Sequence, residues 1–95
     1  METVCVIAKE DLPKYHMATG DSLTSTEARS QRKKDIDRAM LLGNNEHQKV
    51  KIIFDSTEGA MLVETTVWEV TQNYLILKSN VAVPIRCVRK IEFFE

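Results

Sequence analysis

The chain lacks the residue patterns on which most catalytic, metal-binding and membrane-spanning proteins depend. Its two cysteines, Cys5 and Cys87, form no CxxC pair, and His16 and His47 have no cysteine or carboxylate at metal-ligand spacing. There is no catalytic triad and no glycine-rich phosphate loop. No apolar run approaches the ~20 residues of a membrane-spanning helix. These absences predict a non-enzymatic scaffold with no metal, no cofactor and no membrane contact.

An excess of charge of one sign is missing as well. The formal net charge is −1, so no overall field draws the chain to nucleic acid or to a membrane surface. Two cysteines without a disulfide framework, and a start of chain without the basic segment and apolar core of a secretory signal, predict a cytoplasmic protein. The one local imbalance is residues 29–38, where five Lys or Arg residues accompany two Asp residues.

A length of 95 residues is enough for one domain, which we place at residues 1–95. Within it, residues 1–22 are predicted to form an N-terminal segment and connector, residues 23–43 a helix, and residues 48–95 a small β-barrel. The short apolar run at residues 4–7 is a candidate for an extra strand. A domain of this size buries enough surface for a core without disulfides.

Residues 24–27, Thr-Ser-Thr-Glu, have the form of a capping box and predict the start of the helix. The helix is expected to run to about Leu42, with Gly43 as the left-handed residue that follows its last turn. Its apolar residues fall mostly in the second half. We therefore expect the C-terminal half to dock on the strands while the basic N-terminal half projects.

From residue 49 the apolar pattern changes to period two, which is typical of strands with one buried face. We expect antiparallel strands at residues 49–54, 60–70, 74–78, 81–85 and 90–94. The second is unusually long and must bend or carry a bulge. The inward positions are predicted to form the core: Val50, Ile52, Phe54, Val63, Val67, Leu75, Leu77, Val83, Ile85, Ile91 and Phe93.

Residues 68–78 and 83–91 resemble the strand–turn–strand and closing portions of bacterial Sm-like RNA chaperones. The resemblance implies an α+β fold with an N-terminal helix packed on a bent, antiparallel five-stranded SH3-like or Sm-like small barrel. It also implies RNA or nucleic-acid binding as an alternative function. Arg86 is the residue that stands at the place of the family's base-contacting charge.

Nearly the whole chain is similar to a set of short, uncharacterised bacterial proteins common in Bacteroidota. The shared features include residues 42–45 (Leu-Gly-Asn-Asn), 63–68 (Val-Glu-Thr-Thr-Val-Trp) and 83–85 (Val-Pro-Ile). This resemblance implies membership of a family and brings no function with it.

Trp68, the one tryptophan of the chain, is the first candidate for a functional residue. By strict alternation it points outward on the long second strand, and Tyr74 and Ile76 do so on the next. If no bulge intervenes, the three would form an exposed apolar patch, and such patches usually mark a partner surface. The alternative is that the long strand bulges near Thr66 and turns Trp68 into the core.

The basic stretch supplies candidate phosphate contacts in Arg29, Arg32 and Lys33, and Arg86 adds a fourth. Cys87 defines a third function class, a small enzyme with a thiolate stabilised by neighbouring arginines. Its alternative is a buried apolar thiol.

From these observations we predict a non-enzymatic binding or assembly module that acts through protein–protein contacts. The expected partner is the chain itself or another protein, with a homo-oligomer as one form. The alternative is an Sm-like RNA- or nucleic-acid-binding protein.

Overall fold

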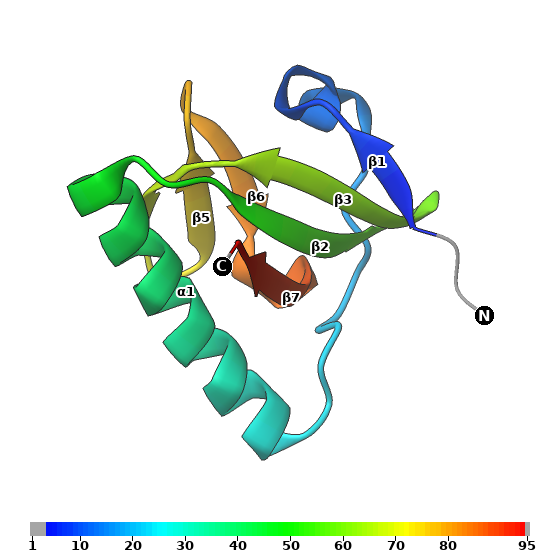
Figure 1. Ribbon diagram of the computed structural model, residues 1–95. Helices are drawn as coiled ribbons and strands as arrows, with labels where there is room; N and C mark the ends of the chain where they lie inside the picture. Colours follow the sequence, from blue (N-terminus) through cyan, green and yellow to red (C-terminus); the bar gives the residue numbers. More distant parts are fainter. Residues whose placement is uncertain (1–3, 95) are drawn as a thin grey trace.

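The computed structural model describes residues 4–94, and in them one long helix accompanies seven strands (Figure 1). Residues 1–3 and 95, the ends of the domain predicted over 1–95, lie outside the described residues. The predicted α+β class is confirmed. The elements in chain order are β1 (Cys5–Ile7), the 3₁₀ helix η1 (Lys9–Lys14), α1 (Thr26–Glu46), β2 (Val50–Ser56), β3 (Gly59–Thr65), β4 (Val67–Val70), β5 (Tyr74–Leu77), β6 (Val81–Pro84), the 3₁₀ turn η2 (Ile85–Cys87) and β7 (Val88–Phe93).

The strands form two sheets rather than one closed barrel. A four-stranded sheet has the order β1-β3-β2-β7, and a three-stranded sheet has the order β4-β5-β6. The predicted count of five strands is wrong for two reasons. Residues 5–7 add β1, which pairs with β3 in parallel and so departs from the all-antiparallel expectation. The long second strand is also divided into β3 and β4.

The division falls at Thr66, where the predicted strand 60–70 leaves one sheet and enters the other. β3 pairs with β2, whereas β4 pairs with β5. The Thr66 carbonyl accepts a hydrogen bond from the Lys78 N–H at 3.0 Å, so the break keeps a backbone partner. The bend that the length of this strand required is therefore present, and it joins the two sheets.

The core lies between the two sheets and the helix, and most of its strand residues are those predicted by parity, whereas Met61 of β3 and Val88 of β7 were not predicted. Ile52, Phe54, Leu75 and Leu77 are completely buried. Of the eleven predicted core residues only Ile85 and Phe93 are partly buried rather than buried. The alternation is confirmed by the register, because Ile52 pairs with Val63 of β3 and with Ile91 of β7. Close-packed residues of this kind supply most of the stabilising burial.

α1 begins and ends later than the predicted range 23–43. Its N-cap is Ser25, whose side-chain oxygen accepts a hydrogen bond from the Ala28 N–H at 3.0 Å. The left-handed residue after the last turn is His47, with φ 51°, and its N–H donates to the Gly43 carbonyl. The prediction that Gly43 takes this position is wrong.

Gly43 lies inside α1, where the helix crosses β4. A Cβ at this position would lie 2.2 Å from the Val67 carbonyl oxygen and 3.1 Å from the Thr66 methyl carbon. The glycine is thus required by the close approach of helix and strand, and not by the backbone conformation of a helix end. This approach fixes the C-terminal half of α1 on the edge of the three-stranded sheet, while the helix also contacts β7 of the other sheet (Figure 1).

Candidate functional site

The outer face of the β4-β5-β6 sheet carries the exposed aromatic residues of the predicted partner surface. Trp68 is 44% exposed and Tyr74 is 45% exposed, and Ile76 is partly buried. Their inward neighbours Val67 and Leu75 are completely buried. The alternative in which Trp68 enters the core is therefore wrong.

A β-bulge determines where Trp68 lies. In the β4–β5 pair Val67 is opposite Leu77 and Glu69 is opposite Ile76, so Trp68 is the extra residue between two paired positions. The Trp68 side chain stays on the outer side of the sheet, next to the point where the β5 partner changes from Leu77 to Ile76. Tyr74 lies two residues along β5 from Ile76 and therefore shares its side. We call Trp68, Tyr74 and Ile76 the aromatic face.

Beside this face, two adjoining cavities lie where α1, the β4–β5 turn and the β6–η2 junction meet. Their volumes are about 380 Å³ and 470 Å³, each within the usual range for ligand sites. Both are lined by Arg32, Gln72 and Ile85, so we treat them as one groove and call it the helix–turn groove. Tyr74 also lines it, which makes the groove continuous with the aromatic face.

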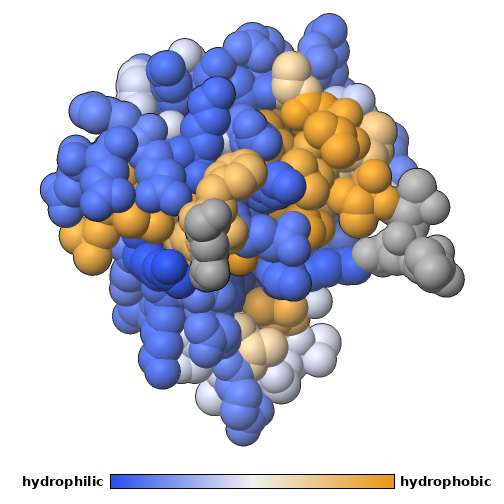
Figure 2. Space-filling model, in the orientation of Figure 1, coloured by the Kyte–Doolittle hydropathy of each residue, from blue (hydrophilic) through white to orange (hydrophobic). Residues whose placement is uncertain are grey.

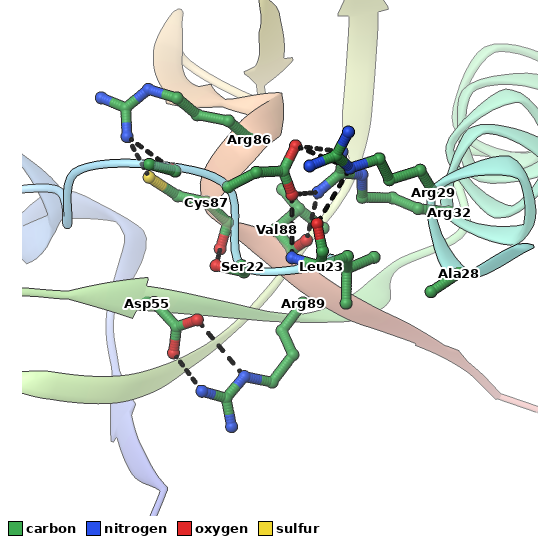
Figure 3. A network of polar contacts seen from close by, with 12 residues as sticks. Ser22, Leu23, Ala28, Arg29, Arg32, Asp55, Arg86, Cys87, Val88 and Arg89 are labelled. Carbon is green, nitrogen blue, oxygen red and sulfur yellow. Dashed lines mark hydrogen bonds and ion pairs between the residues drawn. The ribbon is translucent and has the colours of Figure 1, made fainter. Parts of the chain in front are cut away.

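Arg32 is an internal part of the groove wall. Its side chain is only 8% exposed and forms a bidentate pair with Asp21 of the connector, with both N–O distances 2.9 Å (Figure 3). It also donates to the Val88 carbonyl at 3.1 Å. The hydrogen bonds from Arg32 lower the pKa of the Asp21 carboxyl below its ordinary value. Arg32 therefore ties the connector and β7 to the helix, and its charge is already compensated.

Arg86 and Cys87 lie where η2 meets the connector. Arg86 donates to the Ala18 and Gly20 carbonyls, and the Cys87 Sγ lies 3.3 Å from the Ala18 carbonyl oxygen (Figure 3). Cys87 is completely buried, and burial raises the pKa of its thiol. A thiol with a raised pKa is protonated at neutral pH and is a poor nucleophile. The Arg86 guanidinium donates to neutral carbonyls, and among residues 4–94 it forms no ion pair with a carboxylate.

The structure places all four predicted phosphate contacts around the helix–turn groove. Arg29 and Lys33 lie one helical turn apart on α1, and both line the larger cavity with Arg32. Arg86 lines the smaller one. Arg29 donates to the Leu23 carbonyl at 2.9 Å and lies 3.6 Å from Asp21. Within the described part of the chain, Lys33 makes no hydrogen bond or ion pair, so its charge faces solvent over the groove.

Three features of this region were not predicted from the sequence. Asp21 was assigned only to a connector, and Gln72 and Asn73 only to a turn, yet all three line the groove. Their positions depend on residues far along the chain, and the one available signal was the presence of side-chain amides and a carboxylate in turns.

An exposed apolar strip on the other sheet was also missed. Val6, which is 73% exposed, pairs with Leu62, and Leu62 pairs with Ile53 across β1, β3 and β2. Figure 2 shows apolar side chains gathered over β1 and β3. The signal was available in the sequence, since Ile53 has the parity opposite to that of Ile52.

Known proteins offer no assignment for this arrangement. No protein-family model matches the chain, and no curated protein or solved structure is significantly similar to it. Among residues 4–94 no group of three or more His, Cys, Asp or Glu side chains is placed to hold a metal ion. None of the helices described is both long and apolar enough to span a membrane.

Proposed function

We propose that this chain is a non-enzymatic binding and assembly module that associates with a second copy of itself through the aromatic face. The observation that carries the proposal is the exposure of Trp68 and Tyr74, at 44% and 45%, on neighbouring strands. Tryptophan and tyrosine are the residues most enriched at the centres of binding interfaces. Burial of two such side chains offers a large hydrophobic gain at a low cost in side-chain entropy.

The charges beside the aromatic face support a second copy as the partner. Glu69 of β4 and Lys78 at the end of β5 are both exposed. A twofold contact presents the same surface from both subunits, so residues of opposite charge on one face can meet each other across the axis. The face therefore has charges of both signs, which can pair across a twofold axis and which do not favour a polyanion.

Light-scattering chromatography over a range of protein concentrations tests this proposal. We expect a concentration-dependent dimer that Trp68→Ala converts to a folded monomer, with loss of about tenfold or more in dimer affinity, the effect of removing one interface anchor. The matched control is Leu41→Ala, because Leu41 is 59% exposed on α1 and lies off the aromatic face. A parent chain that stays monomeric at high concentration contradicts the proposal. Equal weakening of the dimer by both variants would show that the contact lies outside the aromatic face.

Nucleic-acid binding is the second candidate, and the gathering of Arg29, Lys33 and Arg86 around one groove favours it. Tyr74 beside that groove offers a stacking surface for a base. If this function holds, a short oligoribonucleotide binds with an affinity that falls steeply with salt. The same chromatography with and without the oligonucleotide separates the two candidates, because only the second predicts a complex with RNA.

We also propose that the two sheets belong to an open SH3-like or Sm-like small barrel. The strand that bends at Thr66, the pairing of β2 with β7 and the 3₁₀ turn η2 before the last strand support this assignment. Membership of the Bacteroidota-type family remains a prediction from the sequence. A cytoplasmic location is proposed on the same basis, with Cys5 and Cys87 both free thiols.

A further inference from the structure

The helix–turn groove has an apolar floor. Ile36 of α1 is 2% exposed, and Val70 and Ile85 are partly buried against the core. All three line the larger cavity of about 470 Å³. A bound side chain of leucine or phenylalanine size would contact this floor on one side and water only on the other. Partial burial of such a side chain on this floor would stabilise a complex.

The rim of the groove is positively charged. Arg29 and Lys33 border one end and Arg86 borders the other, while Arg32 between them is compensated by Asp21. Lys33 has no carboxylate partner among the described residues, and Arg86 bonds only neutral groups. Asp37 is the one further carboxylate in the lining. Cations at both ends of an apolar floor complement an apolar side chain that has carboxylates on each side of it.

The middle of the groove is suited to a polypeptide backbone. Gln72 and Asn73 of the β4–β5 turn are exposed and line it, and each amide side chain offers both a donor and an acceptor. A peptide N–H and C=O require such mixed partners, whereas a phosphate backbone accepts only.

We infer that the helix–turn groove binds an acidic, extended peptide segment of another protein. An apolar side chain of the peptide rests on Ile36, Val70 and Ile85. Carboxylates of the peptide pair with Lys33 and Arg29 at one end and with Arg86 at the other. The site adjoins the aromatic face at Tyr74, but its apolar floor and Lys33 lie in the larger cavity, which none of the residues of the aromatic face lines.

Fluorescence anisotropy with the full chain and labelled octapeptides tests the inference. The first probe is a mixture of peptides with Leu, Ile, Val or Phe at the centre and glutamates on both sides. The second is the same mixture with glutamine in place of glutamate, and the third is an eight-nucleotide oligouridylate. We expect saturable binding of the glutamate peptides that weakens about tenfold, or 1.4 kcal/mol, in Lys33→Glu. Lys34→Glu is the matched control, because Lys34 is an exposed neighbour of equal charge that does not line the groove.

Amide chemical shifts locate the bound peptide. Perturbations at Val70, Gln72 and Ile85 support the groove, and the Trp68→Ala monomer should bind the same peptides unchanged. Absence of saturable binding at about 1 mM peptide overturns the inference. So do equal binding of the glutamine peptides, equal weakening by Lys34→Glu, and tighter binding of the oligouridylate. Chemical-shift changes confined to the aromatic face would show that the peptide does not bind in the groove. The proposal of self-association would be unaffected.

Discussion

The two halves of α1 contact the strands in different ways. The last turns of the C-terminal half pack directly, with Ala39 and Gly43 buried and the Gly43 backbone against the Val67 carbonyl. The N-terminal half is held by the Arg32 side chain, which reaches Asp21 and Val88. Direct packing leaves no space between helix and strand. Attachment through the long Arg32 side chain leaves a gap between helix and strands, which is the helix–turn groove. The space for a ligand therefore lies where the helix is held less closely.

The sequence of the helix explains this difference. Its first half has almost no apolar side chain that is able to fill the gap to the strands, and Arg29, Arg32 and Lys33 stand where such residues would be needed. A long arginine can bridge the gap because its guanidinium keeps hydrogen-bond partners at the far side. The two halves should therefore respond differently to substitution, and three of the expected responses measure that difference.

The largest effect is expected for Gly43→Ala in the C-terminal half. In an open helix position this change stabilises by about 1 kcal/mol, because glycine is a poor helix former. Here the new Cβ would lie 2.2 Å from a backbone oxygen, so α1 must move away from β4. We expect the free energy of unfolding in urea to fall by about 3 kcal/mol, the upper part of the range for overpacking.

Asn44→Ala is the control for this substitution, since Asn44 is the exposed next residue of the same helix. It should change the free energy of unfolding by no more than about 0.5 kcal/mol. If Gly43→Ala proved as stable as the parent, the close approach of α1 and β4 would be wrong, and with it the contrast between the two halves.

An intermediate effect is expected for Arg32→Met in the N-terminal half. Methionine retains much of the apolar stem and removes the bonds to Asp21 and Val88. Hydrogen bonds to charged groups contribute about 1.5–3 kcal/mol, and Asp21 can recover some hydration because its side chain is 22% exposed. We therefore expect a loss of about 2 kcal/mol in urea unfolding.

Arg29→Met separates the role of Arg32 from the general charge of the helix. Arg29 is 52% exposed and lies 3.6 Å from Asp21, so the loss should stay below about 1 kcal/mol, as for other surface pairs. Equal losses in the two variants would mean that Asp21 responds to the summed charge and not to the bidentate bond.

Local sequence patterns predicted the strands. The features that these patterns missed depend on contacts between residues that are far apart in the chain. Alternation identified the buried residues from Val50 to Ile91, because one face of each strand is buried. The turn at 79–80 also followed from local sequence, and Ser79 and Asn80 have φ values of 71° and 62°. The predicted end of the helix was wrong. Glycine after an apolar turn usually caps a helix, whereas Gly43 lies inside α1 at its close contact with the Val67 carbonyl. A sequence pattern cannot show that contact.

The candidate site shows the same division. The outward positions of Tyr74 and Ile76 follow from strand parity, whereas Trp68 is the extra residue of a β-bulge, which strict alternation does not include. The groove was not, because α1, the β4–β5 turn and η2 come together only through the tertiary fold. Arg32 was grouped with Arg29 and Lys33 by composition, and only the position of Asp21 distinguishes it as an internal residue.

The smallest effect concerns pH and the carboxyl group to which the N-terminal half is tied. The bonds from Arg32 lower the pKa of Asp21 in the folded chain below its ordinary value. A carboxyl with a lower pKa in the folded state than in the unfolded state binds fewer protons when folded. Its contribution to stability is therefore complete above the unfolded pKa of about 4 and is lost as the pH falls through the lower folded value.

Asp21→Asn isolates this contribution from that of the other carboxyl groups. The variant keeps an acceptor for Arg32 but no titrating group, so the parent should be more stable at pH 7. The difference in the free energy of unfolding between parent and variant should narrow as urea titrations are carried below about pH 4. The contact of Gly43 with β4 is made by the Val67 carbonyl and the Thr66 methyl carbon, neither of which titrates, so the Gly43→Ala loss should persist at low pH. A parent–variant difference that stayed constant to pH 2 would show that the charge of Asp21 does not contribute to the attachment of the helix.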